Sequence, residues 1–149
     1  MTKGTPGLAR PALLLAAFLA LAPAACAQSG GGDAPLAGTR WMLVALGGDA
    51  ERAADEARAP HLVLAPEGGR VSGSDGCNRL VGTYALEGAR LAFAGVAATR
   101  MACPEGMEQA AAFQRALGAT AGHRVSGGVL ELLDAAGQGV ARLEAARPR

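Results

Sequence analysis

The sequence predicts a small α+β domain: a mostly antiparallel curled sheet, a partial barrel of about seven or eight strands, with one helix packed on it. Two observations predict this fold class. From residue 39 onward, short strand-like runs alternate with glycine-containing turns. One segment after Cys103 instead has apolar residues at helical spacing. The roughly 110 residues involved are enough to bury about two-thirds of their extended-chain surface, so the domain can fold alone.

The first three strands are expected between residues 41 and 73. Trp41–Leu46 is the first, and a polar, alanine-rich stretch to Pro60 follows as a loop that can include a helical turn. His61–Ala65 and Arg70–Gly73 then flank Pro66–Gly69, which predicts a hairpin with a longer turn.

Two further hairpins can be assigned a register. In Val81–Ala94, a two-residue turn at Glu87 and Gly88 predicts three cross-strand pairs: Leu86 with Ala89, Tyr84 with Leu91, and Gly82 with Phe93. The apolar members of this hairpin then share one face, which is expected to be a core face.

The second hairpin turns at Gly127–Gly128. It pairs Val125 with Leu130 and places the charged pair Arg124 and Glu131 on the opposite face. The last strand is expected at Val140–Glu144, after a turn from Asp134 to Gly139.

The single helix is expected to begin at Pro104, because proline suits the first helical position and Glu105 the positive N-terminal end. Its core-facing stripe would consist of Ala110, Phe113 and Leu117. Gly118 is the expected C-cap.

The N-terminal part of the chain is typical of a secretion signal over residues 1–25. Lys3 and Arg10 precede an uncharged apolar run at 11–22, which is shorter than the roughly 20 residues that span a bilayer. An N-terminal core helix is the alternative, but the run lacks a polar face. Residues 26–37 are then expected to be a flexible linker, and residues 38–146 the folded domain.

Cys26 follows the apolar run at the point where a signal would be cleaved. The segment Ala22–Cys26 resembles a bacterial lipobox, which implies that Cys26 carries a lipid anchor and that the protein is an exported envelope lipoprotein. Pro23 departs from that pattern, since leucine is usual three residues before the cysteine. Cleavage after Ala24 or Ala27, which would release a soluble periplasmic or secreted protein, stays open.

Charge and composition argue against a nucleic-acid partner. The chain has 14 basic and 13 acidic residues, and loss of Lys3 and Arg10 with the signal would leave a net charge of about −1. Such a domain has no electrostatic footprint for a polyanion. We expect no cofactor, and a monomer.

Cys77 and Cys103 are expected to form a disulfide, because an exported protein folds in an oxidising compartment. A nucleophilic cysteine would need a neighbouring base, and His61 and His123 are the only candidates. No zinc-ligand spacing occurs. A hydrolase is therefore a weak alternative, and we expect no catalytic residue and no metal ligand.

Two segments resemble the signatures of META (HslJ-like) domains. Gly73–Tyr84 is similar to the pattern G-x-x-G-C-N-x-x-x-G-x-Y, and Thr99–Cys103 to T-x-M-x-C. The likeness extends over about residues 38–144 and implies a sheet wrapped around one helix. It implies no catalytic residues. Bacterial members resemble a heat-shock lipoprotein associated with novobiocin resistance, which implies a role in stress or antibiotic tolerance.

The motif residues have two interpretations. The glycines, with Asp75 and Asn78, can form a tight loop held by its cysteine. Alternatively, the disulfide brings together a recognition surface made of Asn78, Arg79, Thr99, Arg100 and Met101. The function that follows is a non-catalytic envelope module that binds a protein or a small ligand. The alternative is an inhibitor of an envelope hydrolase, with a protruding loop at Asp75–Leu80.

Overall fold

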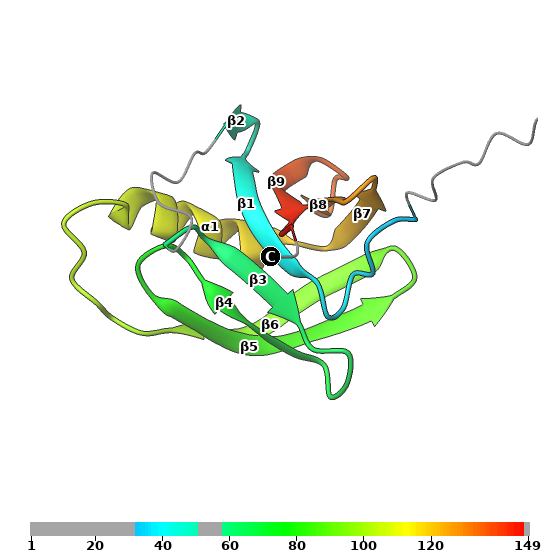
Figure 1. The fold of residues 1–149 in the computed structure, drawn as a ribbon, viewed down its shortest axis with the longest axis horizontal. Coiled ribbons are helices and arrows are strands. Elements are labelled where there is room, and N and C mark those ends of the chain that lie inside the picture. Colours follow the sequence, from blue (N-terminus) through cyan, green and yellow to red (C-terminus); the bar gives the residue numbers. More distant parts are fainter. Residues whose placement is uncertain (1–31, 51–57, 148–149) are drawn as a thin grey trace, which may run out of the picture. The chain divides into compact units, whose positions relative to one another are not determined.

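The computed structural model describes residues 32–50 and 58–147, which form one compact unit (Figure 1). The predicted secretion signal, Cys26 and the stretch 51–57 lie outside the described residues. The elements are β1 (Arg40–Leu46), β2 (Asp49–Ala50), β3 (His61–Leu64), β4 (Arg70–Ser74), β5 (Arg79–Glu87), β6 (Arg90–Ala98), α1 (Met107–Ala119), β7 (Gly122–Ser126), β8 (Val129–Leu133) and β9 (Gly139–Ala145).

All the strand pairings are antiparallel, and they follow the order β2-β1-β3-β4-β5-β6-β7-β8-β9. The strand β9 also pairs with β1, which curls the sheet back on itself. Strand pairing in the sheet is sparse between β6 and β7, which share the single residue pair Arg90–Gly122. The predicted α+β fold class is confirmed, with the short β2 as an additional strand.

The core lies between the inner face of the curled sheet and α1 (Figure 1). The predicted stripe Ala110, Phe113 and Leu117 is buried, together with Ala116. Trp41 is fully buried on β1, and its indole nitrogen donates to the carbonyl of Leu36 at 2.9 Å. Burial of one helical stripe and one sheet face is what the sequence pattern predicts.

Both ends of the helix differ from the prediction. The helix begins at Met107 rather than at Pro104, because Gly106 has a left-handed conformation (φ 83°) that no helical residue adopts. It ends at Ala119, and its C-cap is Thr120 rather than Gly118. Thr120 caps it: its N–H donates to the Leu117 carbonyl, and its hydroxyl donates to the Ala116 carbonyl at 2.8 Å.

The register predicted for the β5–β6 hairpin is wrong by two residues. Leu86 pairs with Leu91, and Tyr84 with Phe93. The reason is the turn, in which Gly88 (φ 59°) takes the first central position rather than the second. A slip of two residues leaves every side chain on its own face, so hydrophobic alternation cannot detect it. Gly82 lies at a bulge facing Val96, not Phe93.

The register predicted for the β7–β8 hairpin is confirmed. Val125 pairs with Leu130, and Arg124 pairs with Glu131, whose side chains form a 3.1 Å salt bridge. The hairpin across Pro66–Gly69 is also present.

The packed domain begins before residue 38, within the segment expected to be a linker. Leu36 packs against the core, and Ala37 forms a bridge to Leu64. The Asp33 carboxylate accepts a hydrogen bond from the Gly127 N–H at 2.7 Å.

Candidate functional site

The structure contains the disulfide between Cys77 and Cys103, with 6.0 Å between their Cα atoms. Cys77 lies in the turn between β4 and β5, and Cys103 in the segment between β6 and α1. The bond therefore ties together the two signature segments of the sequence. Neither sulfur is available as a thiol nucleophile.

A buried carboxylate organises the loop next to the disulfide. Asp75 is fully buried (0% exposed), and its Oδ1 accepts hydrogen bonds from the N–H groups of Cys77 and Asn78. Its Oδ2 accepts from the Asn78 amide at 3.1 Å and from the Gln114 amide of α1 at 2.6 Å. The short-range bonds were expected from the sequence. The bond from Gln114 was not, because the two residues are 39 positions apart.

These hydrogen bonds set the ionisation of Asp75. Burial acts to raise the pKa of the carboxyl, but the donors on Asn78, Cys77 and Gln114 favour the charged form more strongly. The pKa of Asp75 therefore lies below its ordinary value. A carboxylate that accepts four hydrogen bonds and has a lowered pKa is suited to holding a loop, not to proton transfer near neutral pH.

The same network fixes the second signature segment. The Asn78 Oδ1 accepts a hydrogen bond from the N–H of Met101 at 2.9 Å. The Thr99 hydroxyl accepts one from the N–H of Arg79 at 3.0 Å, and the N–H of Thr99 donates to the carbonyl of Arg79. Disulfide, carboxylate and cross-strand bonds thus hold the two segments against each other.

The structure divides the predicted recognition surface. Asn78 is buried and structural, whereas Arg79, Thr99, Arg100 and Met101 are exposed. Asp75, Asn78 and Leu80 are all buried. The inhibitor hypothesis requires the loop Asp75–Leu80 to protrude, and burial of these residues shows that it does not.

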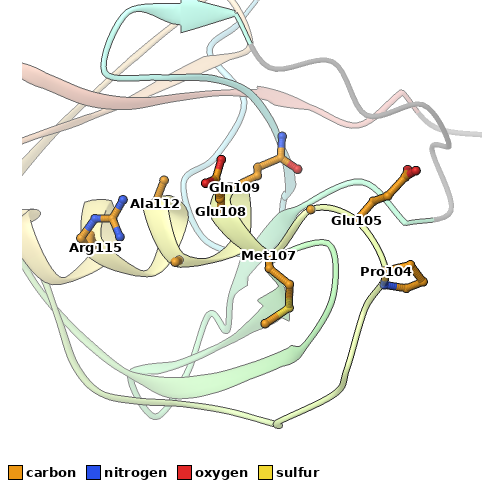
Figure 2. A pocket seen from close by; sticks show the side chains of 9 residues that line it. Pro104, Glu105, Met107, Glu108, Gln109, Ala112 and Arg115 are labelled. Atoms are coloured by element: carbon orange, nitrogen blue, oxygen red, sulfur yellow. The ribbon is translucent and has the colours of Figure 1, made fainter.

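Exposed residues lie next to the disulfide in the structure or along the chain, and we call Arg100, Met101 and Met107 the disulfide rim: Met101 and Met107 each have an atom near the Cys77 sulfur, and Arg100 precedes Met101 in the sequence. Met101 is 57% exposed and Met107 is 50% exposed. The Met107 Sδ lies 3.9 Å from the Cys77 Sγ, and the Met101 carbonyl oxygen lies 3.5 Å from the same sulfur. Figure 2 shows the Met107 side chain directed into the space between the start of α1 and the preceding loop. This open hollow of about 830 Å³ is also lined by Pro104, Glu105 and Arg115.

A second hollow, of about 500 Å³, lies on the outer face of β1, β3, β4 and β5. We call it the outer hollow. Its lining includes Arg40, His61, Ser72, Ser74 and Arg79 and the valines Val63 and Val81. Of these, the sequence singled out Arg79 for the recognition surface and His61 only as a candidate base for a nucleophilic cysteine. The others come from alternate positions of separate strands, and only the cross-strand register brings them together.

His61 lies at one end of the outer hollow. Its Nδ1 is 3.0 Å from the Ala59 carbonyl oxygen and 3.3 Å from the Arg40 guanidinium. Burial lowers the pKa of His61, the hydrogen bond to Ala59 opposes this, and the Arg40 charge lowers it further. The lowered pKa favours the neutral form of the imidazole.

The signature glycines and tyrosine have structural roles. A Cβ at Gly73 would lie 2.0 Å from the His61 carbonyl oxygen, and one at Gly82 would lie 3.0 Å from the Val96 Cα. Gly76 has a φ of 96°, which other residues rarely adopt. The Tyr84 hydroxyl donates to the Ala65 carbonyl at 2.6 Å. These positions favour the interpretation of the motif as a tightly held loop.

The described residues contain neither a metal-binding cluster nor a membrane-spanning helix. No group of three or more His, Cys, Asp or Glu side chains in residues 32–50 and 58–147 could hold a metal ion. Within the same ranges, no helix is long and apolar enough to cross a membrane.

Comparison with known proteins gives a consistent family. The META domain model matches residues 34–147. A solved protein structure from Burkholderia xenovorans is 28% identical with a TM-score of 0.57, and the match covers 75% of this chain and 85% of that one. Another NMR structure is 24% identical with a TM-score of 0.56, covering 72% and 88% respectively, and shows the same fold. No curated protein sequence matches the chain. Since the family model spans most of the sequence, the chain belongs to the META domain family.

Proposed function

We propose that this META domain is a non-catalytic binding module of the bacterial cell envelope, tethered through Cys26, and that it recognises a protein partner through the disulfide rim. The observation that carries the proposal is the combination of a rigid backbone and exposed thioethers. The Met101 N–H is held by Asn78, yet the Met101 side chain is 57% exposed.

A fixed backbone lowers the entropic cost of binding, and methionine side chains adapt to varied apolar surfaces. Two exposed methionines, each with an atom near the same disulfide sulfur, therefore offer adaptable apolar groups on one part of the surface. Arg100, exposed beside Met101, adds a residue type that is enriched in interfaces.

Groups that could act in catalysis are instead engaged in holding the loop, which supports a binding role. Cys77 and Cys103 are joined, and the Asp75 carboxylate is occupied by four donors. A role in stress or novobiocin tolerance rests on the family resemblance and is part of the proposal.

Photocrosslinking tests the recognition surface. A photoreactive residue at position 101 should trap one defined envelope protein, and the same residue at Leu86 should not. Leu86 is the matched control, since it is also exposed (44%) but lies at the far end of β5. Excess unlabelled parent protein should abolish the crosslink, and a Met101→Glu/Met107→Glu competitor should not. Equal trapping at both positions would contradict the proposal.

The anchor needs its own experiment. Intact mass of the protein extracted from membranes should show diacylglyceryl modification at Cys26, and Cys26→Ser should move the protein to the soluble fraction. Retention of Cys26→Ser in the membrane with unchanged mass would disprove the anchor.

A further inference from the structure

The cross-strand register builds the outer hollow from two rows of side chains. Directly paired residues of neighbouring strands lie on the same face of a sheet. The pairings place His61, Ser74 and Arg79 in one row and Arg40, Val63, Ser72 and Val81 in the next. The two rows cross four adjacent strands, so their alignment follows from the fold and not from a single motif.

Among the described residues, the lining of the outer hollow carries positive charge and no acidic side chain. Arg40 and Arg79 line it, and no aspartate or glutamate among the described residues does. The salt bridges in the described part of the chain involve Arg90 and Arg124, not these two. Like charges gathered in a concavity without acidic partners raise the local concentration of anions.

Apolar and hydroxyl groups lie between the two charges. Val63 is half-buried, and Val81 is 58% exposed. Ser72 sits between these valines in its row and is exposed. The strands β1 and β5 are three spacings apart, about 14 Å, which two long arginine side chains can bridge around a small molecule.

We propose that the outer hollow binds a small amphiphilic organic anion, with its charged group held by Arg40 and Arg79 and its apolar part on Val63 and Val81. Guanidinium groups form paired, charge-assisted hydrogen bonds with carboxylate and phosphate, and the Ser72 hydroxyl can add one donor. The site shares no lining residue with the disulfide rim, so it goes beyond the proposed recognition of a protein and does not depend on it.

The binding test uses three probes with the same hexyl chain: hexyl phosphate, hexanoate and hexanol. Each is titrated into the purified full-length protein at constant ionic strength, and backbone amide shifts are followed by NMR. We expect one or both anions to bind with a Kd on the order of millimolar, as suits so few heavy atoms. The shifts should concentrate on β1, β3, β4 and β5. Hexanol should bind at least about 10-fold more weakly, because it lacks the charge that the arginines hold.

Matched variants identify the residues. Arg40→Gln and Arg79→Gln should each weaken anion binding about 10-fold or more, which is the loss of one charge-assisted contact. Arg70→Gln is the control, since Arg70 is exposed on β4 but does not line the hollow. Ser72→Asp should abolish binding through repulsion, whereas Ser72→Asn should leave it within about threefold.

Several results would overturn the proposal. They are the failure of both anions to bind, equal binding of hexanol, shifts confined to other strands, and equal losses in Arg70→Gln and Arg79→Gln. Binding to anionic phospholipid vesicles without binding of either soluble anion would replace the small-molecule site with a membrane surface. Anion-selective binding that is lost in Arg40→Gln and Arg79→Gln but retained in Arg70→Gln would establish the small-molecule site.

Discussion

Replacing Asp75 with alanine removes the acceptor on which the disulfide loop depends. The carboxylate takes two hydrogen bonds from backbone N–H groups and two from the amides of Asn78 and Gln114. All four donors would lose their partner at once, at a fully buried position. Asp75→Ala is therefore expected to be among the most damaging single substitutions outside the apolar core.

The magnitude follows from the hydrogen bonds. A hydrogen bond to a charged group contributes about 1.5–3 kcal/mol, and a buried donor left unpaired costs about 1–3 kcal/mol. The four contributions do not add fully, because Cys77 is only half-buried and water can reach part of the loop. We therefore expect Asp75→Ala to lower the free energy of unfolding by about 3–5 kcal/mol. Gln114→Ala, which removes one donor, should cost about 1–2 kcal/mol.

Urea unfolding of the oxidised protein at pH 7 measures these changes. Asp134→Ala is the matched control, because the Asp134 carboxylate also accepts two backbone hydrogen bonds, both 2.9 Å, but in an exposed turn. It should cost less than about 1.5 kcal/mol. The double variant Asp75→Ala/Gln114→Ala should be about 1–2 kcal/mol less damaged than the sum of the single variants. A loss in Asp75→Ala no larger than in Asp134→Ala would refute the central role of the buried carboxylate.

Three other predictions concern the same loop and its strands. Reduction of the disulfide, or Cys77→Ser/Cys103→Ser, should destabilise the domain by about 3–4 kcal/mol, because the bond closes a loop with a sequence separation of 26 residues; an unchanged urea midpoint would contradict this. Gly73→Ala should lower the melting temperature sharply, since its Cβ would overlap the His61 carbonyl. The control Gly118→Ala, within α1 and with open space around it, should raise the free energy of unfolding by about 0.5–1 kcal/mol. Similar melting temperatures of the two variants would show that β4 accommodates the added methyl group without loss of stability. Because the folded pKa of Asp75 lies below its unfolded value of about 3.9, the stability it contributes is complete above that pH and is lost as the pH falls through and below it. The difference in stability between the parent and the non-titrating Asp75→Asn should therefore shrink in acid, and a constant difference from pH 7 to pH 2.5 would argue against ionised Asp75.

The fold was largely predictable because its signals are local. Alternation of apolar and polar residues marks the strands, and spacing of Ala110, Phe113 and Leu117 marks the helix face. The helix ends were not predictable from residue preferences. Proline and glycine suited the first position and the cap, but the left-handed Gly106 and the hydroxyl of Thr120 set the actual limits.

The candidate site was predictable only in part. Pairing of Cys77 with Cys103 follows once Cys26 is assigned to the lipid anchor, and the local bonds of Asp75 follow from the tendency of aspartate to accept backbone hydrogen bonds in turns. The bond from Gln114 depends on how α1 packs, and no local pattern announces it. The outer hollow likewise depends on the register of four strands. Alternation of apolar and polar residues shows which face a side chain lies on, but not which residue of the next strand it pairs with.

The structure separates what the META signature specifies from what it leaves free. Its fixed positions shape the loop: Gly73 and Gly82 allow close backbone approach, Asn78 joins the two segments, and Tyr84 ties β5 to the β3–β4 turn. Exposed Arg79 and Arg100 occupy free positions. Signature residues that maintain geometry, with variable residues facing solvent, allow domains of one fold to bind different ligands.

Met101 departs from this division. It is a fixed position of the T-x-M-x-C element, yet its side chain is 57% exposed. Its hydrogen bond to Asn78 uses only the backbone N–H, which any residue except proline would supply. The loop geometry therefore does not explain why a methionine stands there. The proposed partner contact would use a thioether that faces solvent on a rigid backbone, and this makes the disulfide rim, rather than the buried motif, the surface to test.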